Sequence, residues 1–327
     1  MKRAAIIGAG LSGLVVARRL AGVADVHLFE KSRGPGGRAA TRHIGDYSFD
    51  HGTQFFTART AAFQSFLEPL IERGIVADWP ARFAEIDGGS IRNKRVWGEG
   101  GAHYVATPGM NSLGKSLASG LNIQTGVEIR SIERQSDGWM LRDQSGREFA
   151  QFDWLVLTAP SAQTGALAED QPKLTALCQE RAMLGCFALM LGFGEPLDLP
   201  WDAAVVRNAD ISWMAVNSSK PGRGEPFAMV VHSTNRWANE HIDEAEEMVQ
   251  AHMLAEASRQ NGADLGIAEV KKLQRWRYAN LPRQSGPKYF LDSDVGLAAC
   301  GDWFIRGRVE AAFTSATRLA DELVGQF

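Results

Sequence analysis

A glycine-rich turn between a short apolar run and an amphipathic stretch constrains the fold most strongly. The sequence GAGLSG occupies residues 8–13, and residues 14–21 have the pattern of a helix. Gly8 permits a tight turn, Gly10 lets the backbone approach a pyrophosphate, and Gly13 allows the helix to pack closely on the preceding strand. The N–H groups of the helix N-terminus favour phosphate. The motif therefore predicts a Rossmann-like dinucleotide-binding domain.

An acidic residue ends the second predicted strand, residues 25–29. Glu30 follows Gly13 by 17 positions, where a carboxylate can accept hydrogen bonds from ribose hydroxyls. Its negative charge disfavours a 2′-phosphate at the same place. We therefore expect Glu30 to bind the adenosine ribose, with a glycine turn that merely packs well as the alternative.

A second glycine doublet follows in KSRGPGGR, residues 31–38. A nicotinamide dehydrogenase does not need this loop, whereas a longer, flavin-bearing dinucleotide benefits from it. Gly36 and Gly37 let backbone amides reach a pyrophosphate, and Arg38 adds charge-assisted hydrogen bonds. The alternative is an exposed basic loop.

A third motif, Cys300-Gly301-Asp302-Trp303, lies near the C-terminus and precedes a predicted helix at about 309–324. An aspartate after a buried strand can bind the ribityl hydroxyls of a flavin. The N-terminus of the helix can stabilise the negative charge of a reduced flavin. The alternative is a buried turn capped by Asp302.

The remaining segments predict an α/β chain with a discontinuous Rossmann-like FAD/NAD(P)-binding domain and an inserted substrate-binding domain of mixed or antiparallel sheet plus helices. We assign residues 1–56, 98–160 and 292–327 to the first domain and 57–97 and 161–291 to the second. A long helix is expected at about 243–261, with Ala245, Met248, Val249, His252 and Met253 on one face.

Composition excludes several classes of protein. Apolar residues make up 45% of the 327 residues and the net charge is −3, so neither disorder nor binding to nucleic acid is expected. The three cysteines suit a cytoplasmic protein without a disulfide framework. No apolar run suggests a signal peptide or a membrane span, and no spacing of histidines and cysteines suggests a metal site. The oligomeric state stays open.

Six segments of the chain, which include the three motifs above, together resemble the flavin-containing amine oxidase superfamily and, more narrowly, the bacterial renalase-like proteins. The residues that carry the resemblance are 8–30, 33–38, 50–56, 108–110, 158–160 and 300–303. The resemblance implies non-covalently bound FAD and an oxidase that converts the 2- or 6-dihydro isomers of NAD(P) to NAD(P)+, with O2 reduced to H2O2. The alternatives are an amine oxidase acting on a small amine and a non-catalytic FAD-binding protein.

The resemblance also implies roles for individual residues. Gly8, Gly10, Ser12 and Gly13 would hold the pyrophosphate, Glu30 the ribose, and Lys31 and Arg38 would flank the phosphates. The other expected cofactor contacts are Gln54, Phe55 and Phe56 beside the isoalloxazine, the backbone of Val127 at adenine, Asp302 at the ribityl chain, and Val309 and Glu310 at the pyrimidine edge of the flavin.

Three residues of the inserted domain resemble renalase pocket residues and are the candidates for the reaction site: Trp213, His232 and Trp276. Aromatic walls and one hydrogen-bonding group suit a flat hydride donor that must stack on a flavin. The alternative is that all three are core residues. Arg275 and Arg277 alternate around Trp276 on a predicted strand, so we expect them on the opposite face.

Overall fold

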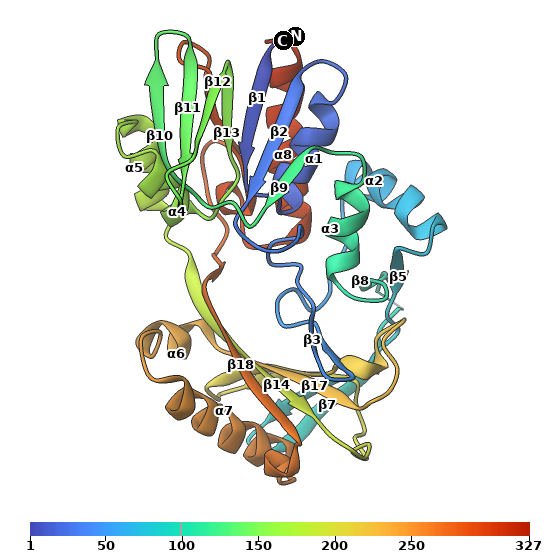
Figure 1. The fold of residues 1–327 in the computed structure, drawn as a ribbon. Helices are drawn as coiled ribbons and strands as arrows, with labels where there is room; N and C mark the ends of the chain where they lie inside the picture. The colour runs from blue at the N-terminus through green and yellow to red at the C-terminus, as the bar shows by residue number, and fades with distance from the viewer. Residues whose placement is uncertain (99) are drawn as a thin grey trace. The chain divides into compact units, whose positions relative to one another are not determined.

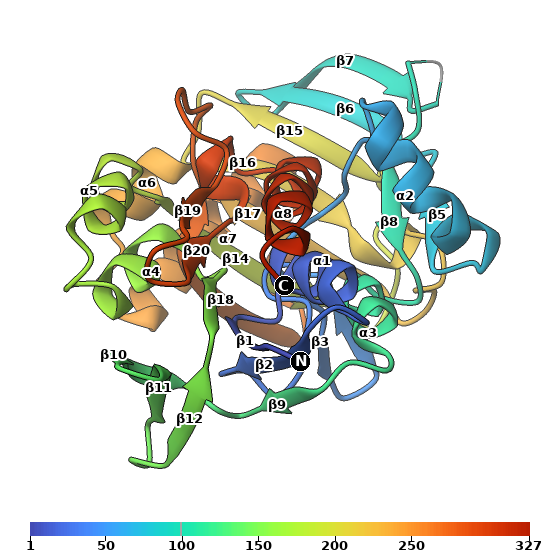
Figure 2. The same ribbon diagram turned by 90° about the horizontal axis from the view of Figure 1, so that it is seen from above.

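The computed structural model describes residues 1–98 and 100–327, which form two compact units. The first unit comprises Met1–Ala39, Leu113–Met183 and Asn280–Phe327, and the second comprises Ala40–Ser112 and Leu184–Ala279. One unit is built on a mainly parallel sheet and the other on a mainly antiparallel sheet (Figures 1 and 2). The predicted α/β class, with a Rossmann-like domain and a second domain of mixed sheet, is confirmed.

A six-stranded sheet forms the centre of the first unit. In spatial order its strands are β19 (Phe290–Asp292), β20 (Leu297–Ala299), β13 (Trp154–Leu157), β1 (Arg3–Ile7), β2 (Asp25–Glu30) and β9 (Ile123–Thr125). All neighbours are parallel except β19, which runs antiparallel to β20. The central strands are short and apolar because both of their faces are buried.

Two layers enclose this sheet (Figure 1). On one side α1 (Leu11–Leu20) and α8 (Val309–Val324) lie against each other, as Figure 2 also shows. On the other side the antiparallel sheet of β10 (Ile129–Gln135), β11 (Gly138–Asp143) and β12 (Glu148–Phe152) packs its apolar residues against those of β1 and β13. Helices α4 (Ser161–Leu167) and α5 (Pro172–Glu180) complete this core.

A seven-stranded sheet forms the second unit. Its spatial order is β18 (Val270–Asn280), β14 (Leu184–Gly192), β17 (Ala228–Ser233), β16 (Ile211–Val216), β15 (Ala203–Arg207), β6 (Arg82–Asp87) and β7 (Ser90–Val96). The β15–β6 pair is parallel, whereas the pairs β14–β17, β17–β16, β16–β15 and β6–β7 are antiparallel. The remaining elements are β3 (Arg42–Ile44), β4 (Tyr47–Phe49), α2 (Ala61–Glu72), β5 (Val76–Asp78), β8 (Tyr104–Ala106), α6 (Asn235–Glu240) and α7 (Glu246–Asn261), and α3 (Asn111–Ala118) spans the boundary between the units.

The two faces of this sheet differ because alternate residues of a strand point to opposite sides. Met214 and Val231 belong to the large core beneath α6 and α7, together with Met253 of α7. Ala188 and Val230 point the other way and pack with Phe49 and the β3–β4 hairpin. We call this second side the hairpin face.

The position of α7 corrects one expectation. Its buried residues are Val249, Met253, Ala257 and Gln260, whereas Met248 is 65% exposed. Ala245 and His252 are exposed as well. Val249 and Met253 are buried as predicted, but the buried face continues through Ala257 and Gln260 and does not include the other three predicted positions.

The units also divide the chain at places that differ from the expected domain boundaries. Residues 40–56 fall in the second unit, since β4 packs on β17. Residues 161–183 fall in the first unit, since α4 packs on β10. The assignment of cofactor binding to one domain and substrate binding to the other stays a prediction. Among the described residues, no helix is both long and apolar enough to span a membrane.

Candidate active site

The first glycine turn has the geometry that close approach to a phosphate requires. Gly8 has φ +106°, and a Cβ there would lie 2.8 Å from Thr158 Oγ1. A Cβ on Gly13 would lie 1.9 Å from the carbonyl oxygen of Gly8, so helix α1 packs where only glycine fits. A Cβ on Gly10 would meet no atom within 4 Å. Gly8 and Gly13 thus shape the turn, and Gly10 forms its open side.

The second glycine loop packs directly on the first. The N–H of Gly36 donates to the carbonyl of Ala9 at 2.8 Å. A Cβ on Gly37 would lie 3.2 Å from Cα of Gly10, and one on Gly114 of α3 only 2.5 Å from Cα of Gly36. Gly36 and Gly37 therefore make close backbone contacts, whereas a Cβ on Gly34 would meet no atom within 4 Å. Lys31 is exposed, and phosphate binding by this loop stays a prediction.

Glu30 is buried, with 6% of its surface exposed, and joins the two loops. Its Oε2 accepts the N–H of Ala9 and its Oε1 accepts the N–H of Ser32, each at 2.8 Å. A carboxylate can accept further hydrogen bonds from hydroxyl groups. The N–H of Val127 donates to the carbonyl of Glu30 at 3.0 Å, and the contact of the Val127 backbone with adenine stays a prediction.

Arg38 and Asp302 form a two-bond ion pair within the first unit. Arg38 Nη1 donates to Asp302 Oδ2 at 2.9 Å and Nη2 donates to Oδ1 at 2.5 Å. The Asp302 side chain is 5% exposed and that of Arg38 is 30% exposed. The two motifs predicted contacts of Arg38 and Asp302 with different parts of the cofactor, whereas the two side chains pair with each other in one fork.

The N-termini of α1 and α8 lie close together in the first unit. Neither Gly10 of α1 nor Arg308 of α8 provides a side-chain cap. Ser12 Oγ donates to the carbonyl of Ala312 at 3.1 Å, which holds α1 against the first turn of α8, where Val309 and Glu310 lie. Helix N-termini favour negative charge, so with the open side of Gly10 this region fits a dinucleotide cofactor with two phosphates.

Cys300 precedes this region but is buried completely, and burial raises the pKa of its thiol well above its usual range. A buried, protonated thiol is a poor nucleophile. Among the residues that the structure describes, no group of three or more histidines, cysteines and carboxylates is placed to hold a metal ion.

Three charged side chains are buried together in the second unit. Asp50 Oδ2 lies 3.2 Å from Nζ of Lys220 and 2.5 Å from Nη2 of Arg223, and the three side chains are at most 1% exposed. Burial raises the pKa of Asp50, but the charges of Lys220 and Arg223, the N–H of Met110 and the hydroxyl of Thr41 outweigh burial and lower it below its usual value. Burial lowers the pKa of Lys220 to about 8.

The side-chain amide of Gln54 extends this cluster. Its Oε1 accepts from Lys220 Nζ at 3.3 Å. Its Nε2 lies 2.5 Å from the carbonyl of Asp50, 3.1 Å from the carbonyl of Gly52 and 3.3 Å from Nε2 of His232. Because lysine can only donate, its position fixes which end of the amide is the oxygen.

His51 and His232 are kept neutral beside this amide. Burial and the charge of Lys220 lower the pKa of His232 to about 3, although a hydrogen bond to the backbone of His51 raises it. Burial and the charge of Arg42 lower the pKa of His51 to about 4. The His51 ring stacks on Trp276, with centroids 5.3 Å apart, and Trp276 Nε1 donates to the His51 carbonyl at 2.8 Å.

The three candidate reaction residues lie on the hairpin face. Trp213 pairs with His232 across β16 and β17, and Trp276 packs with the Phe49 core of the same face. Arg275 points to the opposite side, where it lies 5.6 Å from the ring of Phe187, as expected from strand alternation. The structure therefore brings the candidates to one face, and their part in a reaction stays a prediction.

Phe55 and Phe56 have different surroundings. The Phe55 ring lies 4.7 Å from that of Trp97, 5.3 Å from that of His103 and 5.5 Å from that of Trp213. Phe56 is 4% exposed and packs against Phe63 and Tyr104 in the interior of the unit. Of the two, Phe55 belongs to the aromatic cluster that includes a candidate reaction residue.

Sequence reasoning missed several residues of this region: Asp50 beside Gln54, His51 beside Trp276, Trp97 and His103 beside Phe55, and Lys220 and Arg223. The last two occur in KPGRG (220–224), which has the composition of a surface turn. A lysine and an arginine three positions apart carry no sequence signal of burial. Only the placement of Asp50 between them could reveal it.

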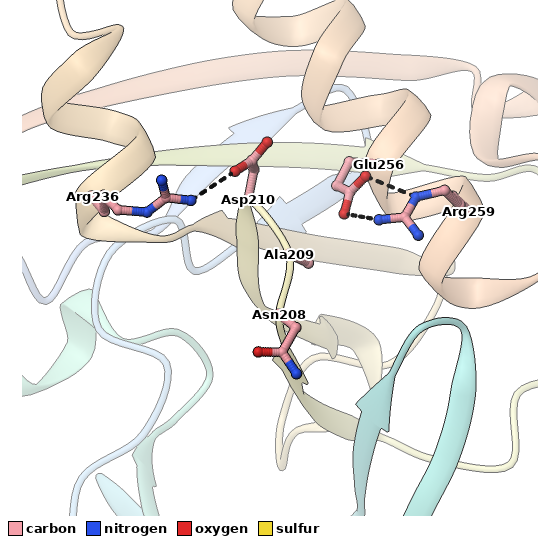
Figure 3. Close-up of a pocket in the computed structure, with 6 residues that line it drawn as sticks. All are labelled: Asn208, Ala209, Asp210, Arg236, Glu256 and Arg259. Carbon is pink, nitrogen blue, oxygen red and sulfur yellow. Dashed lines mark hydrogen bonds and ion pairs between the residues drawn. The ribbon is translucent and has the colours of Figure 1, made fainter.

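A pocket of about 390 Å³ elsewhere in the second unit is a poor candidate (Figure 3). It lies at the turn between β15 and β16, beside α6 and α7. Arg236 is paired with Asp210, and Arg259 with Glu256 (Figure 3). The charged side chains of the pocket are thus neutralised in ion pairs. The pocket lies on the helix side of the sheet, whereas Trp213 and His232 lie on the hairpin face.

Comparisons with known proteins agree with this organisation. Residues 6–70 match the model of an NAD(P)-binding Rossmann-like domain, and residues 58–324 match that of the flavin-containing amine oxidoreductases. The chain is similar to the crystal structure of a putative protoporphyrinogen oxidase from Exiguobacterium sp. 255-15, with a TM-score of 0.77 at 14% identity over 100% of this chain and 99% of that chain. It is also similar to wild-type putrescine oxidase bound to putrescine, with a TM-score of 0.70 at 12% identity over 99% of each chain.

The structural likenesses show the fold, whereas the second family model covers most of the sequence and shows the family. The expected cofactor, FAD, and the expected class of enzyme are thereby confirmed. This chain belongs to the flavin-containing amine oxidoreductase family and is an FAD-dependent oxidoreductase.

Proposed function

We propose that the enzyme is a renalase-like oxidase that acts on the 2- or 6-dihydro isomers of NAD(P). The balanced reaction is dihydro-NAD(P) + H+ + O2 → NAD(P)+ + H2O2. Bound FAD supplies the redox chemistry, because a flavin can take up a hydride and return the electron pair to O2. The protein positions the donor and tunes its surroundings.

The observation that carries the proposal is the indole N–H of Trp213. Trp213 Nε1 is buried and has no hydrogen-bond partner among the described residues. An indole N–H can only donate, and a buried donor without an acceptor costs about 1–3 kcal/mol. The carboxamide oxygen of a dihydronicotinamide is an acceptor that could satisfy it. An alkylammonium group has only donors.

The charges of the second unit also favour this substrate over a cationic amine. Asp50 is already paired with both Lys220 and Arg223, so this buried cluster has one more positive than negative group. A surplus positive charge disfavours a second cation nearby. The flat rings of Trp213 and Trp276 on the hairpin face suit a planar donor instead.

The second candidate is an amine oxidase acting on a small amine. It is favoured by the description of the family and by the likeness to putrescine oxidase. The two functions differ in the donor and in the product. A neutral amine would present a lone pair to the site, and its oxidation would release an imine.

Product analysis distinguishes them. The holoenzyme is incubated in air with 6-dihydro-NAD, 2-dihydro-NAD, ordinary NADH or a panel of mono- and diamines, and NAD+, H2O2 and aldehyde are quantified. We expect NAD+ and H2O2 in equal amounts from a 2- or 6-dihydro isomer. H2O2 formed only with an amine, together with the corresponding aldehyde, would establish the second candidate.

A further inference from the structure

The proposed function uses the buried ammonium group of Lys220 only for its charge and not for its hydrogen bonds. Its side chain is completely buried in the second unit and lies 5.4 Å from the centre of the Trp79 ring. Burial of a lysine is costly unless its donors are used. Here they reach two acceptors, Asp50 Oδ2 at 3.2 Å and Gln54 Oε1 at 3.3 Å.

The first of these acceptors does not require the lysine. Asp50 also accepts from Arg223 at 2.5 Å, from Thr41 Oγ1 at 2.7 Å and from the N–H of Met110 at 3.0 Å. The carboxylate is therefore held by three other donors. The contact that only Lys220 makes is the one with Gln54.

That contact determines the orientation of the amide. With Oε1 directed at Lys220, the Nε2 end of Gln54, which carries two hydrogens, has three groups within reach: the carbonyls of Asp50 and Gly52 and the Nε2 atom of His232. An amide hydrogen that points at a neutral imidazole nitrogen requires a lone pair there. In a neutral ring, the hydrogen of His232 is then on Nδ1.

We propose that Lys220 is a positioning residue, which sets the amide of Gln54 and thereby holds His232 in its Nδ1–H tautomer on the hairpin face. The proposal deepens the proposed function, since that face carries Trp213 and Trp276, the walls for the dihydronicotinamide. It implies that His232 shapes the site through a fixed, neutral ring and does not act as a base. The chain of contacts runs from Lys220 through Gln54 to His232.

The variant Gln54→Glu tests this series of contacts from Lys220 through Gln54 to His232 without removing the lysine. A carboxylate can still accept from Lys220 but cannot donate to His232. His232 would then have to present a hydrogen at Nε2. In holoenzyme labelled with 15N-histidine, we expect nitrogen NMR to show the Nδ1–H tautomer of His232 in the wild type and an Nε2–H or doubly protonated ring in Gln54→Glu. The His232→Gln variant assigns the signals.

Lys220→Met and Arg223→Met form a matched pair. Each removes one cation from Asp50, but only Lys220→Met removes the donor to Gln54. We expect Lys220→Met to give a mixture of His232 tautomers and Arg223→Met to keep the wild-type tautomer, even if both lower the melting temperature. If Lys220→Met does not fold, Gln54→Glu decides the question.

Kinetics supply a second readout. Because a displacement of about 1 Å at a reacting group can cost about 100-fold in rate, we expect Gln54→Glu to slow flavin reduction by the preferred donor about 10- to 100-fold. The same tautomer in Gln54→Glu as in the wild type would overturn the proposal, as would equal tautomer changes in Lys220→Met and Arg223→Met. The NMR samples contain no hydride donor. The tautomer of His232 is therefore measured independently of whether a dihydronicotinamide proves to be the substrate.

Discussion

The guanidinium group of Arg38 and the carboxylate of Asp302 meet in a fork of two hydrogen bonds, although the residues are 264 positions apart. The pair joins the second glycine loop to the segment that precedes α8. Each residue belongs to a different sequence motif that predicts FAD binding. Their pairing explains why these motifs occur together, because one carboxylate, itself nearly buried, holds the arginine beside the glycine turns.

We first predict that Asp302→Asn lowers both stability and FAD affinity. The amide keeps the shape of the carboxylate but leaves the Arg38 charge without its counter-ion, and a charge-assisted hydrogen bond contributes about 1.5–3 kcal/mol. We expect the melting temperature of the apoprotein to fall by several degrees and FAD to dissociate more readily. Calorimetry and fluorescence titration with FAD measure the two effects. Wild-type values in both would show that the fork has no such role.

The second prediction concerns Glu30. Glu30→Ala removes the acceptor for the N–H groups of Ala9 and Ser32 and, by our proposal, for the ribose. We expect the dissociation constant of FAD to rise about 10- to 100-fold, which corresponds to about 1.4–3 kcal/mol. Glu30→Gln retains an acceptor oxygen and should bind FAD better than the alanine variant. Equal affinity for all three proteins would remove Glu30 from the cofactor site.

The third prediction is a loss of stability in mild acid caused by the buried histidines. An unfolded histidine takes up a proton below about pH 6.5, whereas His51 does so only near pH 4 and His232 only near pH 3. Between about pH 6.5 and these lower pKa values, the unfolded chain binds more protons than the folded protein does. The free energy of unfolding therefore decreases as the pH falls through this window, by about 1.4 kcal/mol per pH unit for each histidine at most.

Urea denaturation at a series of pH values between 7 and 4 measures this slope. We expect His51→Gln to flatten it, because the amide does not titrate. The variant His43→Gln, at an exposed position of β3, controls for the loss of a histidine as such. An unchanged slope in His51→Gln would contradict the assigned role of His51.

Fourth, we predict that FAD is bound without a covalent link. The chain has no attachment motif that we identify, and Cys300, next to the Asp302 motif, is fully buried with a raised thiol pKa. Precipitation with acid should release all the yellow colour into the supernatant, as measured by absorbance. Flavin that remains with the protein pellet would contradict this prediction.

The sequence allowed the first unit to be predicted in more detail than the second. Apolar runs and glycine spacing predict β1, α1 and β2, because local backbone conformation alone determines the glycine turn between β1 and α1. Alternation placed Arg275 opposite Trp276 correctly.

The long-range polar contacts could not be predicted in this way. Lys220 and Arg223 belong to a sequence typical of a surface turn, yet they are buried around Asp50 because the segment after β4 lies beside the end of β16. Likewise, nothing in either motif indicates that Arg38 and Asp302 pair. Such contacts depend on which distant segments the fold brings together, and pattern and propensity carry no information about that.

Rapid mixing of the oxidised holoenzyme with different donors under anaerobic conditions tests the proposed function most directly. The bleaching of the flavin is followed after mixing with 6-dihydro-NAD, 2-dihydro-NAD, NADH, benzylamine or putrescine. We predict that a 2- or 6-dihydro isomer reduces the flavin at least about 100-fold faster than NADH or either amine, since correct placement of the donor hydrogen dominates the rate. Faster reduction by an amine than by every dihydronicotinamide isomer would contradict the account.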